Sequence, residues 1–240
     1  KSPLCHNRMF NTFSLIFLAA LLVMCALRLW LAQRQITHVM AHRGHVPENF
    51  ADRVDLKTHQ KAADYTVARS RFGRVGSAVE VVMLLAFTLG GGLQILHDFW
   101  SARLDGLPYG VALIFSVLLI SAIVDLPLSL YHQFVIEEEF SFNRMTLRIF
   151  LADHLKQAIL AIVIGTPALL AVLWLMARMG ELWWLYVWLF WCTFNLLLLF
   201  IYPTWIAPLF NKFVPLDDPR LRARVEALLD RCGFASSDLL

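Results

Sequence analysis

Five long apolar runs most constrain how this chain can fold. Each is close to the ~20 residues that a helix needs to cross the hydrocarbon of a bilayer. They lie at Phe10–Leu31, Val75–Phe99, Tyr109–Tyr131, Leu155–Ala177 and Leu182–Ile206. A soluble core does not explain them, because a chain of 240 residues could not cover five helices that are apolar on every side. We therefore predict an all-α, polytopic membrane protein with five transmembrane helices.

The composition agrees with a membrane protein and argues against nucleic-acid binding. Hydrophobic residues make up 59% of the chain and charged residues 16%, whereas soluble domains average about 45–50% and about 25%. The net charge of +3 is too small to indicate a nucleic-acid partner. No two of the four cysteines have a CxxC-like spacing, which argues against a disulfide framework and a cysteine metal site.

The distribution of Lys and Arg predicts the orientation in the bilayer, because these residues concentrate in cytoplasmic loops. Eight of them follow the first run before the second begins, and three more lie around the connection between the third and fourth runs. The opposite side has only Lys1, Arg8, Arg103 and Arg178. We therefore expect the N-terminus outside and the C-terminal tail in the cytoplasm.

Two acidic residues, Glu80 and Asp125, lie inside or near the ends of apolar runs. Ionisable groups there usually face a bundle interior or a wet cavity, although snorkelling or capping explains them equally well. They are candidates for lining a cavity open to the cytoplasm. The triplet Gly90–Gly92 is not followed by the Gly-Lys-Ser/Thr of a phosphate loop, and it predicts a kink or a close helix contact.

The segment HVMAH, His38 to His42, has the spacing that places two imidazoles on one helical face. A zinc protease would need Glu where Val39 stands, to take a proton from the metal-bound water. His45 could serve as a third ligand. Because the spacing alone is a weak signal, we favour a polar juxtamembrane helix over a metal site.

Three prolines follow the fifth run in YPTWIAPLFNKFVPL and predict that the helix does not continue there. The next segment predicts a soluble helix, with Asp218 as N-cap, Pro219 at the first position and Gly233 at the end. We therefore divide the chain into a transmembrane domain, 1–215, and the truncated start of a cytoplasmic domain, 216–240.

The loop FVIEEEFSFNRMT, Phe134 to Thr146, places three acids among aromatic residues. A solvated helix end explains two of the acids. Three aromatic residues, Phe134, Phe140 and Phe142, are unexpected in a loop that is fully exposed to solvent. We predict that the segment folds back against a partner, with one acid held by hydrogen bonds. Asn143 and Arg144 are candidate partners of that acid, and the tail after Leu216 is a candidate docking surface.

Four segments together resemble a known family. FVIEEEFSFNRMT resembles the Phe-x-Ile-Glu-x-x-x-Gly-Phe-Asn signature of the type-1 CAAX prenyl proteases, which are integral-membrane zinc metalloendopeptidases. YPTWIAPLFNKFVPL is similar to the family's segment after its fifth helix, and RGHVPENF and HQKAADYTVARSRFG resemble its first cytoplasmic loop. The likeness runs from about Leu31 to Leu240. Ser141 stands where the pattern usually has glycine, and serine would be strained there if the position needs a positive φ.

The resemblance implies a water-filled chamber of seven helices, of which this chain would supply five. The family's His-Glu-x-x-His motif is absent here and would lie beyond Leu240, so Zn²⁺ is expected to bind ligands outside this chain, and the chain alone should be inactive. Glu137 and Asn143 match the signature. The candidate contacts of the chamber or the loop are Glu137, Phe142, Asn143, Asn211, Glu80 and Asp125.

The resemblance therefore implies the N-terminal membrane domain of a zinc metalloendopeptidase that cleaves membrane-associated, prenylated C-terminal peptides. Its expected partners are the lipid bilayer, the peptide substrate and a missing C-terminal protease domain, and its expected location is a bacterial inner membrane. A non-catalytic membrane scaffold or regulatory protein is one alternative. The other is a small transporter with Glu80 and Asp125 on its ion path, although the sequence shows no repeated halves.

Overall fold

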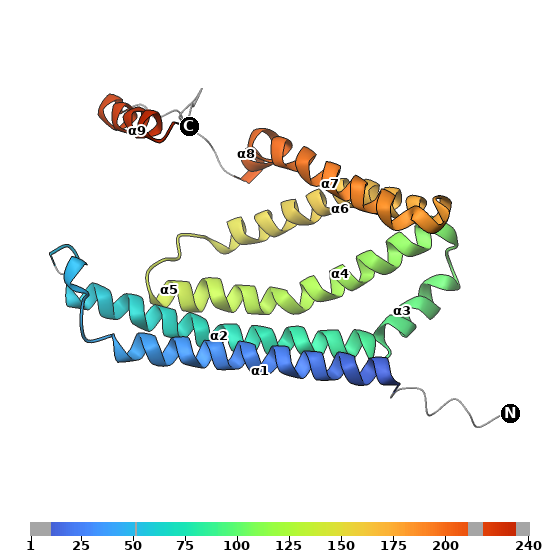
Figure 1. The fold of residues 1–240 in the computed structure, drawn as a ribbon, viewed down its shortest axis with the longest axis horizontal. Coiled ribbons are helices and arrows are strands. Elements are labelled where there is room, and N and C mark those ends of the chain that lie inside the picture. The colour runs from blue at the N-terminus through green and yellow to red at the C-terminus, as the bar shows by residue number, and fades with distance from the viewer. Residues whose placement is uncertain (1–10, 51, 211–217, 234–240) are drawn as a thin grey trace. The chain divides into compact units, whose positions relative to one another are not determined.

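The computed structural model describes residues 11–50, 52–210 and 218–233, and most of them are helical (Figure 1). No strand occurs in these described residues. The chain divides into two compact units, Lys1–Phe150 and Leu151–Leu240.

The first unit begins with two long antiparallel helices that lie side by side, α1 (Thr12–Ala41) and α2 (Leu56–Thr88) (Figure 1). Each helix starts at a polar cap, since the side chains of Asn11 and Asp55 accept hydrogen bonds from amides of the first turn. The connection between the helices contains a short 3-10 helix, Glu48–Phe50.

A glycine bend separates α2 from α3 (Gly92–Ser101), and the two helices meet at 50°. Gly91 has φ +79°, a left-handed conformation that glycine adopts without strain. A Cβ atom at Gly90 or Gly92 would lie only 2.7 or 2.9 Å from the Ala86 carbonyl oxygen. The predicted kink is confirmed, and α2 and α3 together are long and apolar enough to form one bent span.

The third span is a continuous helical path made of α4 (Gly106–Tyr131), a π-turn (His132–Ile136) and α5 (Glu137–Glu139). We call His132–Ile136 the first π-turn. It closes with a hydrogen bond from the Glu137 amide to the His132 carbonyl oxygen.

The fourth span, α6 (Leu147–Arg178), starts in the first unit and continues in the second. A 3-10 turn, Gly180–Leu182, leads into α7 (Trp183–Ile201). The fifth span then passes through Tyr202–Ile206, which we call the second π-turn, and ends in α8, Ala207–Phe210.

The prediction that prolines interrupt the chain after the fifth run is wrong for Pro203 and Pro208, since the chain stays helical through α8. Pro203 has no N–H to donate to the carbonyl four residues earlier. The helix accommodates it by widening, so that the Ala207 amide bonds to the Tyr202 carbonyl oxygen across five residues. Pro215 lies outside the described residues.

The soluble helix predicted after the fifth span is confirmed as α9 (Pro219–Cys232). The Asp218 carboxylate accepts hydrogen bonds from the amides of Arg220 and Leu221, and Gly233 ends the helix at φ +74°. The predicted domain boundary at 215/216 lies outside the described residues and stays a prediction.

Four helical paths are long and apolar enough to cross a membrane: Thr12–Ala41, Gly106–Glu139, Leu147–Arg178 and Gly180–Phe210. Counted as one span, the bent pair α2–α3 makes the fifth, which agrees with the predicted number of membrane helices. Large apolar side chains on them are exposed, for example Phe200 at 74% and Trp205 at 77%. Such surfaces suit contact with lipid or with further helices, and the chain is an integral membrane protein.

Candidate functional site

The segment Phe134–Thr146, which we call the acidic loop, lies at the end of the third span and contacts the side of α2. The Tyr65 hydroxyl on α2 donates a hydrogen bond of 2.6 Å to the Glu137 Oε1 atom. His132 Nε2 lies 3.6 Å from the same oxygen, and the Glu137 side chain is only 15% exposed. Glu137 is therefore held by a side chain that lies 72 residues earlier in the sequence.

The loop reverses direction in a tight backbone turn. The Glu137 carbonyl oxygen accepts hydrogen bonds from the amides of Phe142, at 2.8 Å, and Asn143, at 3.1 Å. Ser141 directly precedes Phe142 in this turn. Its φ is +61°, a left-handed conformation that costs a non-glycine residue free energy. The strain anticipated at this serine is present.

Asn143 ties the loop to the first π-turn. Its Oδ1 atom accepts hydrogen bonds from Gln133 Nε2 and from the Met145 amide, each at 2.8 Å. Its Nδ2 group donates a 3.0 Å bond to Glu138. The prediction that Asn143 holds an acid of this loop is confirmed at Glu138, whereas Glu137 is held by Tyr65. Arg144 is exposed.

Aromatic contacts reinforce the same position on α2. The Tyr65 ring meets Phe140 and Phe142 edge to face, with ring centroids 5.3 and 5.0 Å apart. Lys61 Nζ lies 5.5 Å from the centroid of Phe142. We call Lys61, Tyr65, Glu137, Phe140 and Phe142 the Tyr65 brace. It fixes the end of the third span to the polar start of α2.

Electrostatics favour a neutral tyrosine in this brace. Tyr65 belongs to the polar part of α2, ahead of the apolar run that begins at Val75. The hydrogen bond to the Glu137 carboxylate is the main cause that raises the pKa of Tyr65, and burial and the negative charge add to it. Arg69 acts in the opposite direction. The phenol therefore keeps its proton and remains a hydrogen-bond donor.

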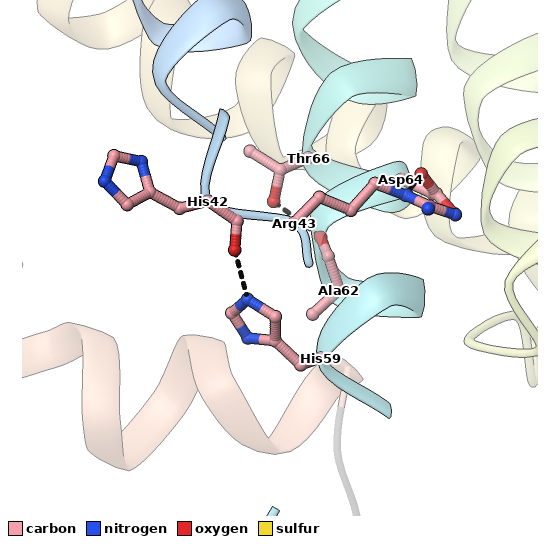
Figure 2. A network of polar contacts seen from close by, with 6 residues as sticks. All are labelled: His42, Arg43, His59, Ala62, Asp64 and Thr66. Atoms are coloured by element: carbon pink, nitrogen blue, oxygen red, sulfur yellow. Dashed lines mark hydrogen bonds and ion pairs between the residues drawn. The ribbon is translucent and has the colours of Figure 1, made fainter. Parts of the chain in front are cut away.

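A second set of polar contacts ties the α1–α2 connection to α2 (Figure 2). Arg43 binds Asp64 through two parallel hydrogen bonds, Nε to Oδ1 and Nη2 to Oδ2, each 2.7 Å long. These bonds raise the pKa of Arg43 and lower the pKa of Asp64, so both groups stay charged. His59 Nε2 donates a 3.0 Å bond to the His42 carbonyl oxygen, as Figure 2 shows.

The histidines of this region do not form a metal site. The His38 and His42 rings lie 4.3 Å apart, and His42 Nδ1 bonds to the His38 carbonyl oxygen at 2.8 Å. Within the described ranges, no three His, Cys, Asp or Glu side chains are placed to hold a metal ion. The described part of the chain therefore does not fit zinc.

The remaining candidate residues lie apart from the brace. Glu80 on α2 pairs with Arg28 on α1 at 3.1 Å. Asp125 is exposed on α4, and it makes no hydrogen bond or ion pair with other described residues. Asn211 lies outside the described residues.

Tyr65, His132 and Gln133 contact the loop but were not among the residues predicted from the sequence. One signal could have pointed to Tyr65, because Lys61, Tyr65 and Arg69 follow one another at a spacing of four and so share one helical face. No local pattern identifies His132 or Gln133 as partners of the loop, because the π-turn that orients them is not visible in the sequence.

Comparison with known proteins gives a family for most of the chain. The family profile described as "CAAX prenyl protease N-terminal, five membrane helices" matches residues 35–212. The CAAX prenyl protease 1 homolog of Caenorhabditis elegans is 31% identical over 229 residues, which cover 94% of this chain and 51% of the relative. The Homo sapiens homolog is 34% identical over 238 residues, with coverages of 91% and 48%.

A solved structure is similar over nearly the whole chain. The crystal structure of S. mikatae Ste24p has a TM-score of 0.84 and 26% sequence identity, and the match covers 95% of this chain and 54% of that chain. The chain therefore spans about half the length of the relatives that it matches.

Proposed function

Because the chain belongs to the CAAX prenyl protease family and matches its N-terminal domain of five membrane helices, we propose that it is the membrane half of a zinc-dependent metalloendopeptidase. The substrates would be membrane-associated peptides with a prenylated C-terminus. The observation that carries this proposal is the family match over residues 35–212, which includes four of the five spans and the whole Tyr65 brace. The names of the relatives support a protease with such substrates.

The zinc ligands and the general base would come from residues outside this sequence. No His-Glu-x-x-His occurs in the 240 residues. When bound, zinc would supply an activated water for attack on the peptide carbonyl. This chain would contribute the walls of the chamber and would be inactive alone.

The candidate residues take two roles in this proposal. Glu137, Phe142 and Asn143 would hold the acidic loop where the membrane half meets the protease domain. Glu80, Asp125 and Asn211 would contact the chamber or its rim, and the exposed position of Asp125 on an apolar span supports contact with water rather than with lipid. Residues 216–240 would begin the cytoplasmic protease domain.

We further propose that the N-terminus lies outside and that the α1–α2 connection and the acidic loop face the cytoplasm. The Lys and Arg distribution supports this orientation. The bond between Tyr65 and Glu137 joins the start of the second span to the end of the third, which supports placing the two loops on the same side of the membrane. The predicted bacterial inner membrane gains no support, because the relatives named above come from eukaryotes.

A chimera tests the proposed function. Residues 1–240 would replace the matching N-terminal half of the S. mikatae protein, and cleavage of a prenylated peptide would be measured. We expect cleavage by the chimera, its loss on zinc chelation and its return on zinc addition. The chain alone should show no cleavage.

Two results would count against the proposal. Cleavage by the chain alone would place the catalytic groups within these 240 residues. A chimera that elutes as one folded species but never cleaves would favour the scaffold alternative. A second chimera, made with the C. elegans relative, controls for the case in which the two halves of the first chimera do not fit at their junction. Ion flux into vesicles that is lost in Asp125→Asn would favour the transporter.

A further inference from the structure

A groove of about 460 Å³ runs between α1 and α2 in the first unit. It exists because the facing residues are small, with Ala32 on α1 opposite Gly73, Ser77 and Ala78 on α2. Such residues let two helices approach closely or, where the helices stay apart, leave a space that a chain-like ligand can enter.

The groove changes from apolar to polar along its length. Cys25 and Leu29 on α1, with Val81 and Val82 on α2, line the end that points toward the middle of the two spans. Polar Gln35 and Ser70 line the end near the α1–α2 connection. The gradient follows from the antiparallel pairing, which sets the polar end of each helix beside the polar end of the other.

Two arginines line the same groove, and among the described residues only one of them has an acid partner. Arg28 pairs with Glu80 at 3.1 Å. Arg74 donates a 3.2 Å hydrogen bond to the neutral side chain of Gln33, and it pairs with no carboxylate among the described residues. Arg74 directly precedes the apolar run that starts at Val75, which is the depth at which a cationic side chain meets lipid headgroups.

We propose that this groove binds one anionic phospholipid. The lipid phosphate would lie against Arg74, with Arg28 nearby, and one acyl chain would follow Leu29 and Val81 toward the middle of the bilayer. An amphiphile with a negative head matches both the gradient of the groove and the uncompensated charge on Arg74. Basic pockets between membrane helices on the cytoplasmic side are a recurrent way of binding such headgroups.

Native mass spectrometry of the 240-residue chain, released from a mild detergent, tests the proposal. The probes are phosphatidylglycerol and phosphatidylcholine with identical acyl chains. We expect the chain to retain several-fold more phosphatidylglycerol. Arg74→Gln should lower this retention several-fold, whereas Arg71→Gln should leave it unchanged, because Arg71 carries the same charge on the same helix but does not line the groove.

A steric pair tests the groove without changing charge. A Cβ atom at Gly73 or at Gly76 would meet nothing within 4 Å, so both positions accept a side chain. Gly73 lines the groove and Gly76 does not. Gly73→Leu should therefore lower phosphatidylglycerol retention several-fold, and Gly76→Leu should not change it. Circular dichroism checks that each variant keeps its helix content.

Several results would overturn the proposal. Equal retention of the two lipids would remove the role of the negative head. An equal loss in Arg71→Gln and Arg74→Gln would indicate diffuse charge attraction, and an equal loss in the two glycine variants would remove the groove. Excess inorganic phosphate should not displace the lipid, because it has no acyl chain; displacement would indicate a phosphate site instead of a lipid site.

Discussion

The two π-turns show that the same change in helix geometry can arise from different causes. In each, the amide that follows the turn bonds to a carbonyl five residues back. The second π-turn, Tyr202–Ile206, contains Pro203, which cannot make the ordinary helical bond. The first, His132–Ile136, contains no proline, and the segment that follows it is held against α2 by Tyr65.

The second π-turn has a cause in its own residues, whereas the first is associated with a contact from a distant part of the sequence. The second π-turn follows from its own residues, and the Thr204 hydroxyl bonds to the carbonyls of Phe200 and Ile201, each at 3.3 Å. The first π-turn places His132 and Gln133 where they reach Glu137 and Asn143. Widened turns of this kind occur frequently at functional sites. The first π-turn is the one that serves to position a loop.

Removing the hydrogen bond between Tyr65 and Glu137 should change the free energy of unfolding the most. Tyr65→Phe leaves the Glu137 carboxylate, which is only 15% exposed, without its donor. Glu137 is partly buried, and the loss of a hydrogen bond to a charged group costs about 1.5–3 kcal/mol of unfolding free energy. SDS titration of the chain in micelles, followed by circular dichroism, would measure this loss.

The matched control is Tyr131→Phe. The Tyr131 ring stacks on Phe72 at 5.2 Å, but its hydroxyl makes no hydrogen bond to other described residues. The two phenylalanine variants should therefore differ in stability. If they unfold at the same SDS fraction, the hydrogen bond from Tyr65 to Glu137 does not stabilise the chain.

Replacing Pro203 should change the free energy of unfolding less than Tyr65→Phe does, and in the opposite direction. Pro203→Ala supplies the missing amide, so we expect the second π-turn to return to an α-helix with a gain of about 1 kcal/mol for one regained hydrogen bond. Hydrogen exchange at position 203 should show a protected amide. Pro127→Ala in α4 is the comparison, because it should leave the first π-turn in place. A fast-exchanging amide at position 203 would mean that the proline is not the cause.

The smallest effect is expected at the strained turn of the acidic loop. Ser141 has φ +61°, and a left-handed conformation costs a non-glycine residue roughly 1–2 kcal/mol. The greater unfolded-state freedom of glycine offsets roughly 0.5–1 kcal/mol, so Ser141→Gly should stabilise the chain by about 0.5 kcal/mol on these principles.

Ser129→Gly, inside α4, provides the control with the opposite sign, since glycine weakens a helix interior. Both variants would be compared by the same SDS titration. A destabilised Ser141→Gly would mean that the serine side chain contributes a contact that outweighs the backbone strain.

Sequence patterns within a few residues predicted much of the fold, but they could not predict contacts between segments far apart in the chain. The Asp218 cap and the Gly91 bend were predictable, because each depends on a few neighbouring residues. The proline prediction failed at Pro203, because a helix can widen by one residue instead of ending. The partner of Glu137 could not be predicted, since Tyr65 lies 72 residues away and sequence spacing does not report pairing between helices.

The ion pair between Arg28 and Glu80 joins the first two membrane helices. By insertion measurements, a charged side chain costs about 2.5–3.5 kcal/mol at the centre of a membrane helix, and a long basic side chain near the helix end can reach the interface. The pair offsets part of this cost only when both helices are present, and its residues are 52 positions apart in the sequence. A cost that is offset only by the pair would favour entry of α1 and α2 into the lipid together, as a helical hairpin.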